Sequence, residues 1–522
     1  MTAIKRRRAL VTRRELLRGS AALAGTSVLT RPALSFAADR PLIPHGLQSG
    51  DVSGNSGMVW ARSDRPSRML VEWATTDSFR NVQDSIFVDA LPESDFTAKA
   101  LLEDLPPGQD IFYRISFQDL STARFGAPQI GSFRSPPNDR RSISFLWSGD
   151  TMGQGWGIDT ARGGMKTYAA MLANRPDFFI HCGDNIYADC PIPAEQKLPD
   201  GTVWRNIVTE EKSKQAETLA DYRGNYKYNL LDDNLRAFNA AVPTLALWDN
   251  HEVMESWWPG QPLPDKPDGE NNTLAFAARA RRAFHEYLPT RETMAELGRV
   301  YRKISYGPLL DIFMLDMRSY RGPNASPSDR NYGPDDYLLG PNQLAWLKRE
   351  LTRSRATWKI IAADSPIGYV IDSGVDADGA HGRGLEIADL LSFIKRAGIC
   401  NIAWITADLH YTAAHYYEPN RATFQDFLPF WEFVSGPLHA GTWTPVRLDR
   451  TFGPQVVFHK APTADQGDNL APCYGLQFFG GMAIDGATGS LTVTLKDMAD
   501  RALWSLRLDP APSAPAQMTM SL

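Results

Sequence analysis

The sequence predicts a large α/β domain preceded by a small all-β sandwich. Within its 522 residues, positions 39–138 hold short apolar runs separated by turn residues. That pattern is typical of a β-sandwich. In residues 139–508, strand-like runs alternate with helix-like segments, which indicates βαβ units. A further observation concerns the second part: five of its apolar runs are followed within three residues by an Asp.

The first 38 residues have the features of an export signal. Basic residues 5–8 and the pair Arg13–Arg14 precede a weakly apolar stretch, Ala21–Leu29, and a small-residue cleavage site at Ser35–Ala38. These regions in this order predict a twin-arginine signal peptide, and therefore export to the periplasm or beyond by the twin-arginine machinery. The alternative is a basic disordered tail. The apolar stretch is too short to span a membrane and no later stretch is long enough, so we predict no transmembrane anchor.

Loss of residues 1–38 leaves an acidic chain. The segment holds eight Lys or Arg and one Glu, a charge of +7, and the whole chain carries −5, so the remainder carries −12. Nonspecific nucleic-acid binding needs a basic surface, so we predict no nucleic-acid partner. The cysteines show no CxxC spacing, which argues against a zinc-thiolate site. An exported chain can form disulfides, but we expect buried free thiols at Cys182, Cys190, Cys400 and Cys473.

In the first domain, the strongest strand patterns are Gly57–Arg62, Met69–Ala74 and Ile111–Phe117. Turn clusters such as Leu105–Gly108 separate such runs. This part of the sequence holds no cluster of metal-binding residue types, so we expect it to serve packing or positioning. The turn-rich segment Pro136–Arg140 is a natural linker to the second domain.

In the second domain, the polar segment Pro191–Ser213 is expected to be a surface loop. From Gly475 onward we expect antiparallel strands that close the sheet, and the Pro- and Ala-rich residues 509–522 predict a disordered tail. Helical patterns occur at Met165–Asn174, Thr218–Phe238, 273–288 and Asn342–Arg353.

Polar residues follow five apolar runs that read as buried strands. A carboxylate at such a place is costly unless it is paired or binds a metal, and ligands bind beyond the carboxyl ends of strands in α/β sheets. Any one Asp could instead cap the next helix. Together, with His and Tyr at matching places, the five ends predict a metal centre. Their polar residues are Asp150; Asp184, Asn185 and Tyr187; Asp249, Asn250, His251 and Glu252; Asp364; and Asp408 and His410.

These residue types suit in-line displacement at a two-metal centre. Carboxylates and amide oxygens are hard ligands, whereas imidazole and phenolate suit iron or another transition metal. Two ions about 3.5–4 Å apart can clamp the attacking and leaving oxygens of an in-line displacement, and they turn bound water into hydroxide near neutral pH. The sequence has neither a Gly-x-Ser-x-Gly elbow nor a Walker loop. Acyl-enzyme and nucleotide-cradle chemistry therefore lack support.

Four of these segments resemble the calcineurin-like metallophosphoesterases, and more closely the PhoD-like alkaline phosphatases and phosphodiesterases: Ser148–Asp150, Gly183–Tyr187, Trp248–Glu252 and Ala407–His410. The resemblance covers nearly the whole chain, because it extends to the signal segment and to His45–Asp51, Tyr222–Arg223 and Leu315–Arg321. The block that ends in Tyr187 is also similar to purple acid phosphatases, in which the Tyr binds ferric iron. The resemblance implies a metallophosphoesterase-type α+β sandwich behind a fibronectin- or Ig-like β-sandwich.

The resemblance also implies roles for the strand-end residues. His251 would protonate the leaving group or stabilise the transition state. Some PhoD-like enzymes carry Cys in place of Asp150 and many carry Asp in place of Asn250, which leaves the metal identities open, above all that of the second ion. The implied Fe(III) ligands are Asp150, Tyr187 and His410; Asp184 would bridge; Asn250 and Asp408, with Asp364 as a further candidate, would hold the second ion, Ca(II) in PhoD-like enzymes.

Three other features have open interpretations. Arg318 and Arg321 either act as catalytic residues that bind phosphate oxygens, which guanidinium forks suit, or pair with structural carboxylates. Trp257–Trp258 either contact substrate from a loop or pack in the core, and packing is favoured. His381, on the Gly-rich segment 379–384, is a candidate to flank the site.

The predicted function is that of an exported, metal-dependent alkaline phosphatase. It would hydrolyse phosphate monoesters, with diesters as further candidates, by attack of metal-bound hydroxide on phosphorus, and its partner would be a small-molecule phosphate ester. One alternative is a phospholipase D-like phosphodiesterase. Another is a binding protein whose metal site is structural; such a site has no use for His251 beside the metal ligands.

Overall fold

The computed structural model describes residues 40–265, 271–294, 296–324, 337–370 and 383–511. Contacts divide the chain into two units, Met1–Arg40 and Pro41–Leu522, and every strand and helix below belongs to the second. The predicted signal peptide, His381 and most of the predicted C-terminal tail lie outside the described residues. Within them, no helix has the length and apolar character needed to cross a membrane.

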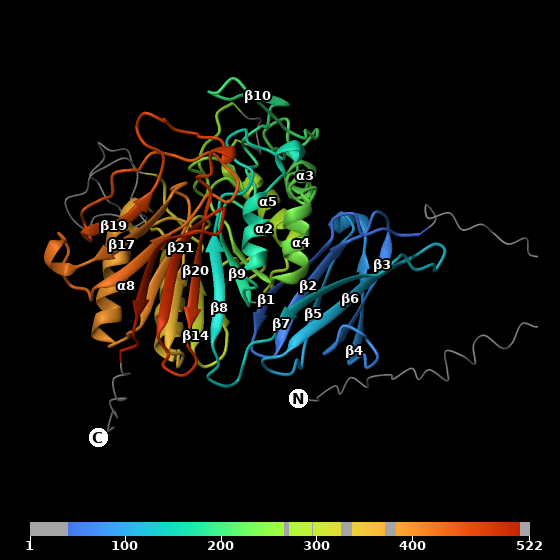
Figure 1. The fold of residues 1–522 in the computed structure, drawn as a ribbon, viewed down its shortest axis with the longest axis horizontal. Helices are drawn as coiled ribbons and strands as arrows, with labels where there is room; N and C mark the ends of the chain where they lie inside the picture. The colour runs from blue at the N-terminus through green and yellow to red at the C-terminus, as the bar shows by residue number, and fades with distance from the viewer. Residues whose placement is uncertain (1–39, 266–270, 295, 325–336, 371–382, 512–522) are drawn as a thin grey trace, which may run out of the picture. The chain divides into compact units, whose positions relative to one another are not determined.

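The first large sheet has nine strands in the order β22-β21-β20-β8-β9-β12-β1-β2-β5 (Figure 1). Its central strands β8 (Ile143–Ser148), β9 (Phe178–Cys182) and β12 (Thr244–Leu247) run parallel, as expected of βαβ units. Antiparallel strands extend the sheet beyond β8, as predicted from Gly475 onward: β20 (Phe478–Ile484), β21 (Leu491–Asp497) and β22 (Ala502–Leu508).

The second large sheet has seven strands in the order β13-β14-β15-β16-β18-β17-β19. Four neighbouring strands of this sheet run parallel to one another. Two of the connections between these strands contain a helix, α6 (Gly340–Arg353) and α8 (Arg383–Arg396). The short helix α7 (Ile367–Val370) follows β15. The strands are β13 (Arg302–Ser305), β14 (Leu310–Met314), β15 (Trp358–Ala362), β16 (Ile402–Thr406), β17 (Thr412–Tyr417), β18 (Phe430–Val434) and β19 (Pro454–Lys460).

The second sheet is buried on both faces, and each face contributes to a different core. Ile312 and Met314 belong to the core shared with the first sheet. Phe313, between them, packs in the core that holds Leu347 of α6 and Leu391 of α8. Alternate side chains of a strand point to opposite faces, so the two sheets pack face to face and α6 and α8 cover the outer face. Burial on both faces explains the continuous apolar runs in the sequence.

The N-terminal strands form a sandwich, one sheet of which continues into the rest of the fold. A separate four-stranded antiparallel sheet has the order β4-β3-β6-β7. Opposite it, β1, β2 and β5 join the nine-stranded sheet, because β1 pairs in parallel with β12 at Gly50 and Thr244. The strands are β1 (Leu47–Ser53), β2 (Ser56–Arg62), β3 (Ser67–Ala74), β4 (Asp84–Ala90), β5 (Thr97–Leu102), β6 (Asp110–Asp119) and β7 (Gln129–Arg134).

Helices α2 (Lys166–Ala173) and α5 (Thr273–Tyr287) match their predicted ranges closely. The prediction of one helix at Thr218–Phe238 was wrong: the segment holds α3 (Leu219–Asn229) and the start of α4 (Asp233–Ala241). The break occurs because the Asp232 carboxylate accepts the backbone N–H of Leu235 at 3.0 Å and so caps α4.

The polar segment 191–213 was predicted to be a loop throughout, but it contains the hairpin β10 (Glu195–Lys197) and β11 (Val203–Arg205). Trp204 of β11 is buried and packs edge-on against Trp156, with ring centroids 5.8 Å apart. This aromatic contact fixes the hairpin to the body of the protein, which a purely polar loop would not do.

Candidate metal centre

The five predicted strand ends come from both large sheets: β8, β9 and β12 from the first, β15 and β16 from the second. The residues after them are buried, apart from the half-buried Asp408. Asp150, Asp184, Asp408 and His410 have positive φ angles of 64°, 52°, 67° and 56°. Non-glycine residues rarely adopt this region, and such backbone strain concentrates at functional sites.

Asp150, Asp184 and His410 form one compact group, with ligand atoms all within 4.8 Å of one another. The Tyr187 hydroxyl lies 2.8 Å from Nε2 of His410, and Oδ1 of Asp150 lies 3.6 Å from the same nitrogen. On the far side of the ring, Nδ1–H donates to the carbonyl oxygen of Gly441. That bond fixes the tautomer and leaves the Nε2 lone pair facing the group, as in metal-ligating histidines.

Several oxygens of this group and of the neighbouring Asn250 lack the partners that buried polar atoms normally have. Both carboxylate oxygens of Asp150, Oδ2 of Asp184 and Oδ1 of Asn250 are buried without a hydrogen-bond partner among the described residues. Burial, together with neighbouring carboxylates, raises the pKa of Asp150 and of Asp184 well above the ordinary value. Unpaired buried oxygens are costly. A cation would satisfy them, so this set of carboxylate, imidazole and phenol groups fits a bound metal ion.

A second set of predicted ligands lines an adjacent polar pocket of about 80 Å³. Asn250, Asp364 and Asp408 lie in its wall with Arg318 and Arg321. Burial raises the pKa of Asp408 to about 7, and burial together with Asp249 raises that of Asp364 well above the ordinary range. A cation bound in this pocket would offset the cost of ionising these two carboxylates.

The two arginines differ in their contacts. Arg318 donates from Nε to Oδ1 of Asp249 at 2.6 Å and to Oδ2 of Asp364 at 3.3 Å. Arg321 is equally buried, but its Nε has no hydrogen-bond partner among the described residues. Burial, with the repulsion of Arg318, lowers the pKa of Arg321 well below the ordinary value. Arg321 therefore leaves at least its Nε donor without a protein partner among the described residues, in the wall of the pocket.

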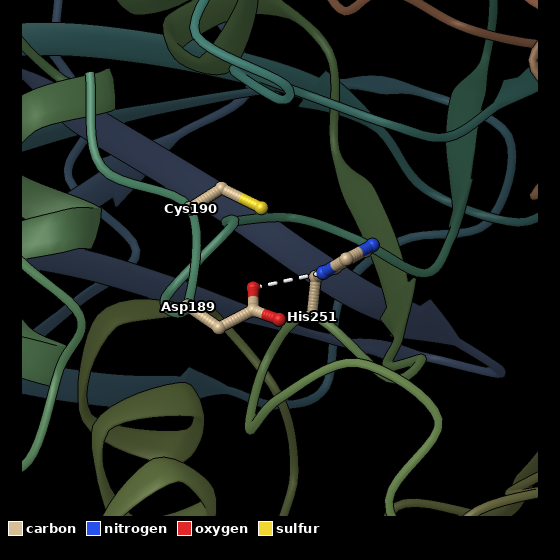
Figure 2. A group of neighbouring side chains, drawn as sticks. All are labelled: Asp189, Cys190 and His251. Carbon is tan, nitrogen blue, oxygen red and sulfur yellow. Dashed lines mark hydrogen bonds and ion pairs between the residues drawn. The ribbon is translucent and has the colours of Figure 1, made fainter. Parts of the chain in front are cut away.

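His251 lies between the metal-ligand group and the pocket. Its Nδ1–H donates to Oδ1 of Asp189 at 2.8 Å (Figure 2), and its Nε2 faces Oε2 of Glu255, a pocket residue, at 3.3 Å. The ring stacks on Tyr187, with centroids 4.3 Å apart. Burial opposes protonation, but the carboxylates of Asp189 and Asp184 outweigh it and raise the pKa of His251 well above the ordinary value.

Two residues at the site have roles that the sequence analysis did not assign. Glu252 accepts the backbone N–H groups of Asp184, Asn185 and Asp249 at 3.1, 2.5 and 2.7 Å. The only sequence feature that pointed to Glu252 was its position at the end of the strand-end segment 248–252. At Gly436, an added Cβ would lie 2.2 Å from Oδ2 of Asp150, so only glycine leaves that oxygen its space. No motif pointed to Gly436.

Neither tryptophan of the loop after β12 lines the pocket, and Trp257 belongs to the hydrophobic core. Trp257 is buried and packs edge-on against Trp248 at 5.8 Å, and Trp258 is half-buried. The favoured interpretation of these aromatics, packing, fits the contacts of Trp257. The four cysteines are free, as expected, but only Cys182 is buried, whereas Cys190 and Cys400 are half-buried and Cys473 is exposed.

Comparison with protein families decides the classification. Residues 145–495 match the family model of the PhoD-like phosphatases, and residues 29–137 match the model of their N-terminal domain. The chain belongs to the PhoD-like phosphatase family. The resemblance inferred from the strand-end motifs is thereby confirmed, and this PhoD-like phosphatase is a hydrolase that acts on phosphoric esters.

Individual relatives agree with this assignment. Alkaline phosphatase D of Bacillus subtilis (strain 168) is 26% identical over 432 residues, which cover 76% of this chain and 71% of the relative. The solved structure of PhoD superposes with a TM-score of 0.67 at 19% identity, covering 89% of this chain and 92% of that one. A purple acid phosphatase from yellow lupin gives a TM-score of 0.53 at 11% identity, covering 90% and 74%. Both structures confirm the predicted fold.

Proposed function

We propose that this PhoD-like phosphatase is an exported enzyme that hydrolyses phosphate monoesters at a two-metal centre. The observation that carries the proposal is the set of unpartnered buried oxygens on Asp150, Asp184 and Asn250, beside a pocket that contains Arg321. One ion would be held by Asp150, Tyr187 and His410 and the other by Asn250, Asp408 and Asp364, with Asp184 between them. Bound ions would supply a water nucleophile at neutral pH and offset the phosphate charge.

Protein groups would bind the phosphate and manage the leaving group. Arg321 would place its guanidinium donors on phosphate oxygens, a geometry that suits its fork. His251 would give the Nε2 proton to the departing ester oxygen, because Asp189 holds the opposite nitrogen and directs Nε2 toward the pocket-lining Glu255. Arg318 would act indirectly, since its pairs with Asp249 and Asp364 hold the end of β15 in place.

The function is tested with a panel of phosphate mono- and diesters on purified, metal-analysed protein. We expect the monoester to be the better substrate; a strong diester preference would instead favour the phospholipase D-like alternative. In the same panel, His251→Ala should lower kcat by about 10²- to 10⁴-fold, the usual contribution of a general acid, while metal content stays constant. His459→Ala, which changes an exposed histidine, is the control. Full activity in His251→Ala would refute its assigned role.

We propose Fe(III) for the ion beside Tyr187 and Ca(II) for the other. The donor set supports this assignment, since phenol and imidazole suit iron whereas Asn250, Asp364 and Asp408 offer oxygen alone. A phenolate on ferric iron absorbs visible light. Tyr187→Phe keeps the stacked ring and removes the oxygen, so the band should vanish and iron content should fall. Colourless, iron-free wild-type protein with full activity would contradict the assignment.

A further inference from the structure

Asp189, Cys190 and His251 form a second group of potential metal ligands (Figure 2). One oxygen, one sulfur and one nitrogen of the three residues all lie within 4.8 Å of one another. The group shares no residue with the proposed ligands of the two-metal centre. It also differs from them in chemistry, because it contains a thiol. Cys190 is half-buried and can be reached by an ion, whereas Cys182, on the other side of the Asp184 motif, is fully buried and not part of the group.

We propose that this group is an inhibitory site for zinc. Thiolate, imidazole and carboxylate are the three ligand types that Zn²⁺ uses in proteins, with Zn–S of about 2.3 Å and Zn–N of about 2.0 Å. Tetrahedral coordination at those lengths puts sulfur and nitrogen roughly 3.5 Å apart. Because the three ligand atoms lie within 4.8 Å of one another, the side chains of Cys190 and Asp189 would have to rotate to reach that spacing. Water would complete the coordination.

Zinc would replace protons that the group now holds. Nδ1 of His251, the nitrogen that faces Asp189, would lose its proton and bind the ion through its lone pair. The Cys190 thiol would lose a second proton and bind as thiolate. Two protons therefore leave for each ion bound. Asp189 would exchange its hydrogen bond to Nδ1 for a bond to zinc, and it would keep the backbone N–H of Glu255, which Oδ2 accepts at 2.6 Å.

Occupancy would disable the proton donor. An imidazolium that gives up its Nε2 proton becomes a neutral ring, but a zinc-bound imidazole that did so would become an imidazolate, which is far less favourable. This consequence rests on the proposed role of His251 as leaving-group acid. The binding of zinc itself does not.

Binding and inhibition are measured separately on the purified, metal-loaded enzyme. Co²⁺ serves as the spectroscopic probe, because a cobalt–thiolate bond gives a charge-transfer band that oxygen and nitrogen ligands do not give. We expect the band in wild type and in Cys473→Ser, an exposed control, and its loss in Cys190→Ser and Cys190→Ala. Added Zn²⁺ should inhibit wild type at least tenfold more strongly than Cys190→Ser, with equal activity of both enzymes in its absence.

The outcomes separate the two ideas. If the cobalt–thiolate band is missing, or survives in both Cys190 variants, the site does not exist. If zinc inhibits wild type and Cys190→Ser equally, it acts at the two-metal centre and the inhibitory site is refuted. A band that depends on Cys190 without inhibition would leave the zinc site standing and contradict the role proposed for His251.

Discussion

Arg318 and Arg321 lie three positions apart and line the same pocket, yet their surroundings assign them different tasks. Arg318 is the buried counter-charge of Asp249 and Asp364, whereas the Nε of Arg321 has no protein partner among the described residues. The sequence left phosphate binding and structural pairing open for both. The contacts favour one interpretation for each residue.

We predict that Arg321→Lys raises KM about tenfold, equal to about 1.4 kcal/mol, with little change in Tm, because an ammonium cannot reproduce the two-pronged contact with phosphate. Arg318→Met should instead destabilise the fold by about 3–5 kcal/mol, the usual result of leaving a buried charge unpaired. Steady-state kinetics and thermal unfolding of both variants decide the matter. Exchanged outcomes, with Arg318 controlling KM and Arg321 controlling Tm, would reverse the assignment.

Residue types at strand ends could be predicted because few reasons exist for a carboxylate after a buried strand. Asp150, Asp184 and His410 meet in the structure as the pattern indicated. The partners of these residues could not be predicted. The Nδ1–H of His410 reaches a backbone carbonyl 31 positions away, at Gly441, and any residue type can supply a carbonyl. Gly436 could not be predicted either, because it matters only by lacking a Cβ atom beside Oδ2 of Asp150.

At the scale of elements, one side chain contacts both the loop after β9 and the loop after β12. Glu252 follows β12, and its carboxylate accepts backbone N–H groups from Asp184 and Asn185 after β9 as well as from Asp249. Asn185 adds its side-chain amide at 2.9 Å. These loops carry Asp184, the proposed bridging carboxylate, and His251, the proposed proton donor, so Glu252 helps to fix the position of one relative to the other.

Glu252→Gln should lower Tm and weaken metal retention. Gln keeps one acceptor oxygen and places an NH₂ group against backbone N–H donors, which leaves buried groups unsatisfied at about 1–3 kcal/mol each. Thermal unfolding and elemental analysis after dialysis measure the two effects. Glu195→Gln, at a side chain with 59% of its surface exposed, is the matched control. A Glu252→Gln protein with unchanged Tm and metal content would show that the loops hold their shape without this carboxylate.

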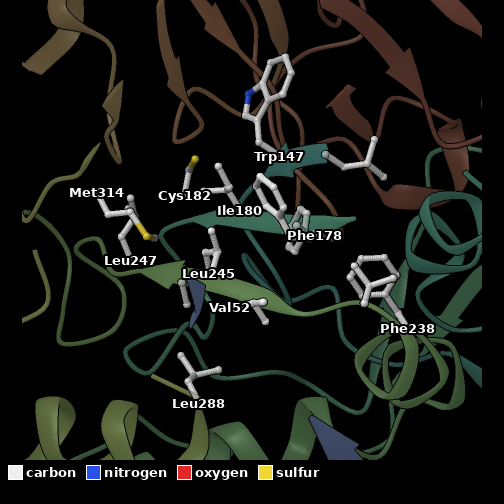
Figure 3. Packing of buried hydrophobic residues seen from close by; sticks show 14 of the residues in the cluster. Val52, Trp147, Phe178, Ile180, Cys182, Phe238, Leu245, Leu247, Leu288 and Met314 are labelled. Atoms are coloured by element: carbon white, nitrogen blue, oxygen red, sulfur yellow. The ribbon is translucent and has the colours of Figure 1, made fainter. Parts of the chain in front are cut away.

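Strands were easier to predict than breaks within helices. The runs that became β9 and β12 are apolar throughout, and Figure 3 shows Ile180, Cys182, Leu245 and Leu247 packed near Met314 of the facing sheet. Such runs can only be buried. The break between α3 and α4 depends on the Asp232 carboxylate turning back to a backbone N–H, one of several local options open to an Asp. The two-sheet arrangement depends equally on long-range packing, which periodicity does not encode.

At the scale of the whole molecule, we predict that the folded enzyme is exported by the twin-arginine route. The basis is the pair Arg13–Arg14 ahead of a weakly apolar segment. Changing both residues to Lys should retain active precursor in the cytoplasm, which fractionation and phosphatase assay detect. Lys substitution at Arg6 and Arg7, outside the pair, keeps the same charge and is the control. Unaltered export in the double Lys variant of Arg13 and Arg14 would contradict the prediction.

Acid stability should depend on His45, just before β1. Burial, assisted by the charges of Arg62 and Lys227 and only partly opposed by Asp95, lowers the pKa of His45 from 6.5 to about 4. Between those values the unfolded chain binds a proton at this site and the folded chain does not. Stability therefore falls as the pH drops from about 6.5 to about 4, by at most about 3 kcal/mol, since each pKa unit is worth about 1.4 kcal/mol.

Replacement of His45 by Gln removes this proton-binding site from both states. Whatever His45→Gln costs at pH 7, where the imidazole is neutral in both states, wild type should lose stability relative to the variant as the pH falls below 6.5. The difference in Tm should therefore narrow or change sign between pH 7 and pH 4.5. His459→Gln, a substitution at an exposed histidine, is the control. A His45→Gln difference that is constant or widens in acid would show that folding does not hold His45 neutral.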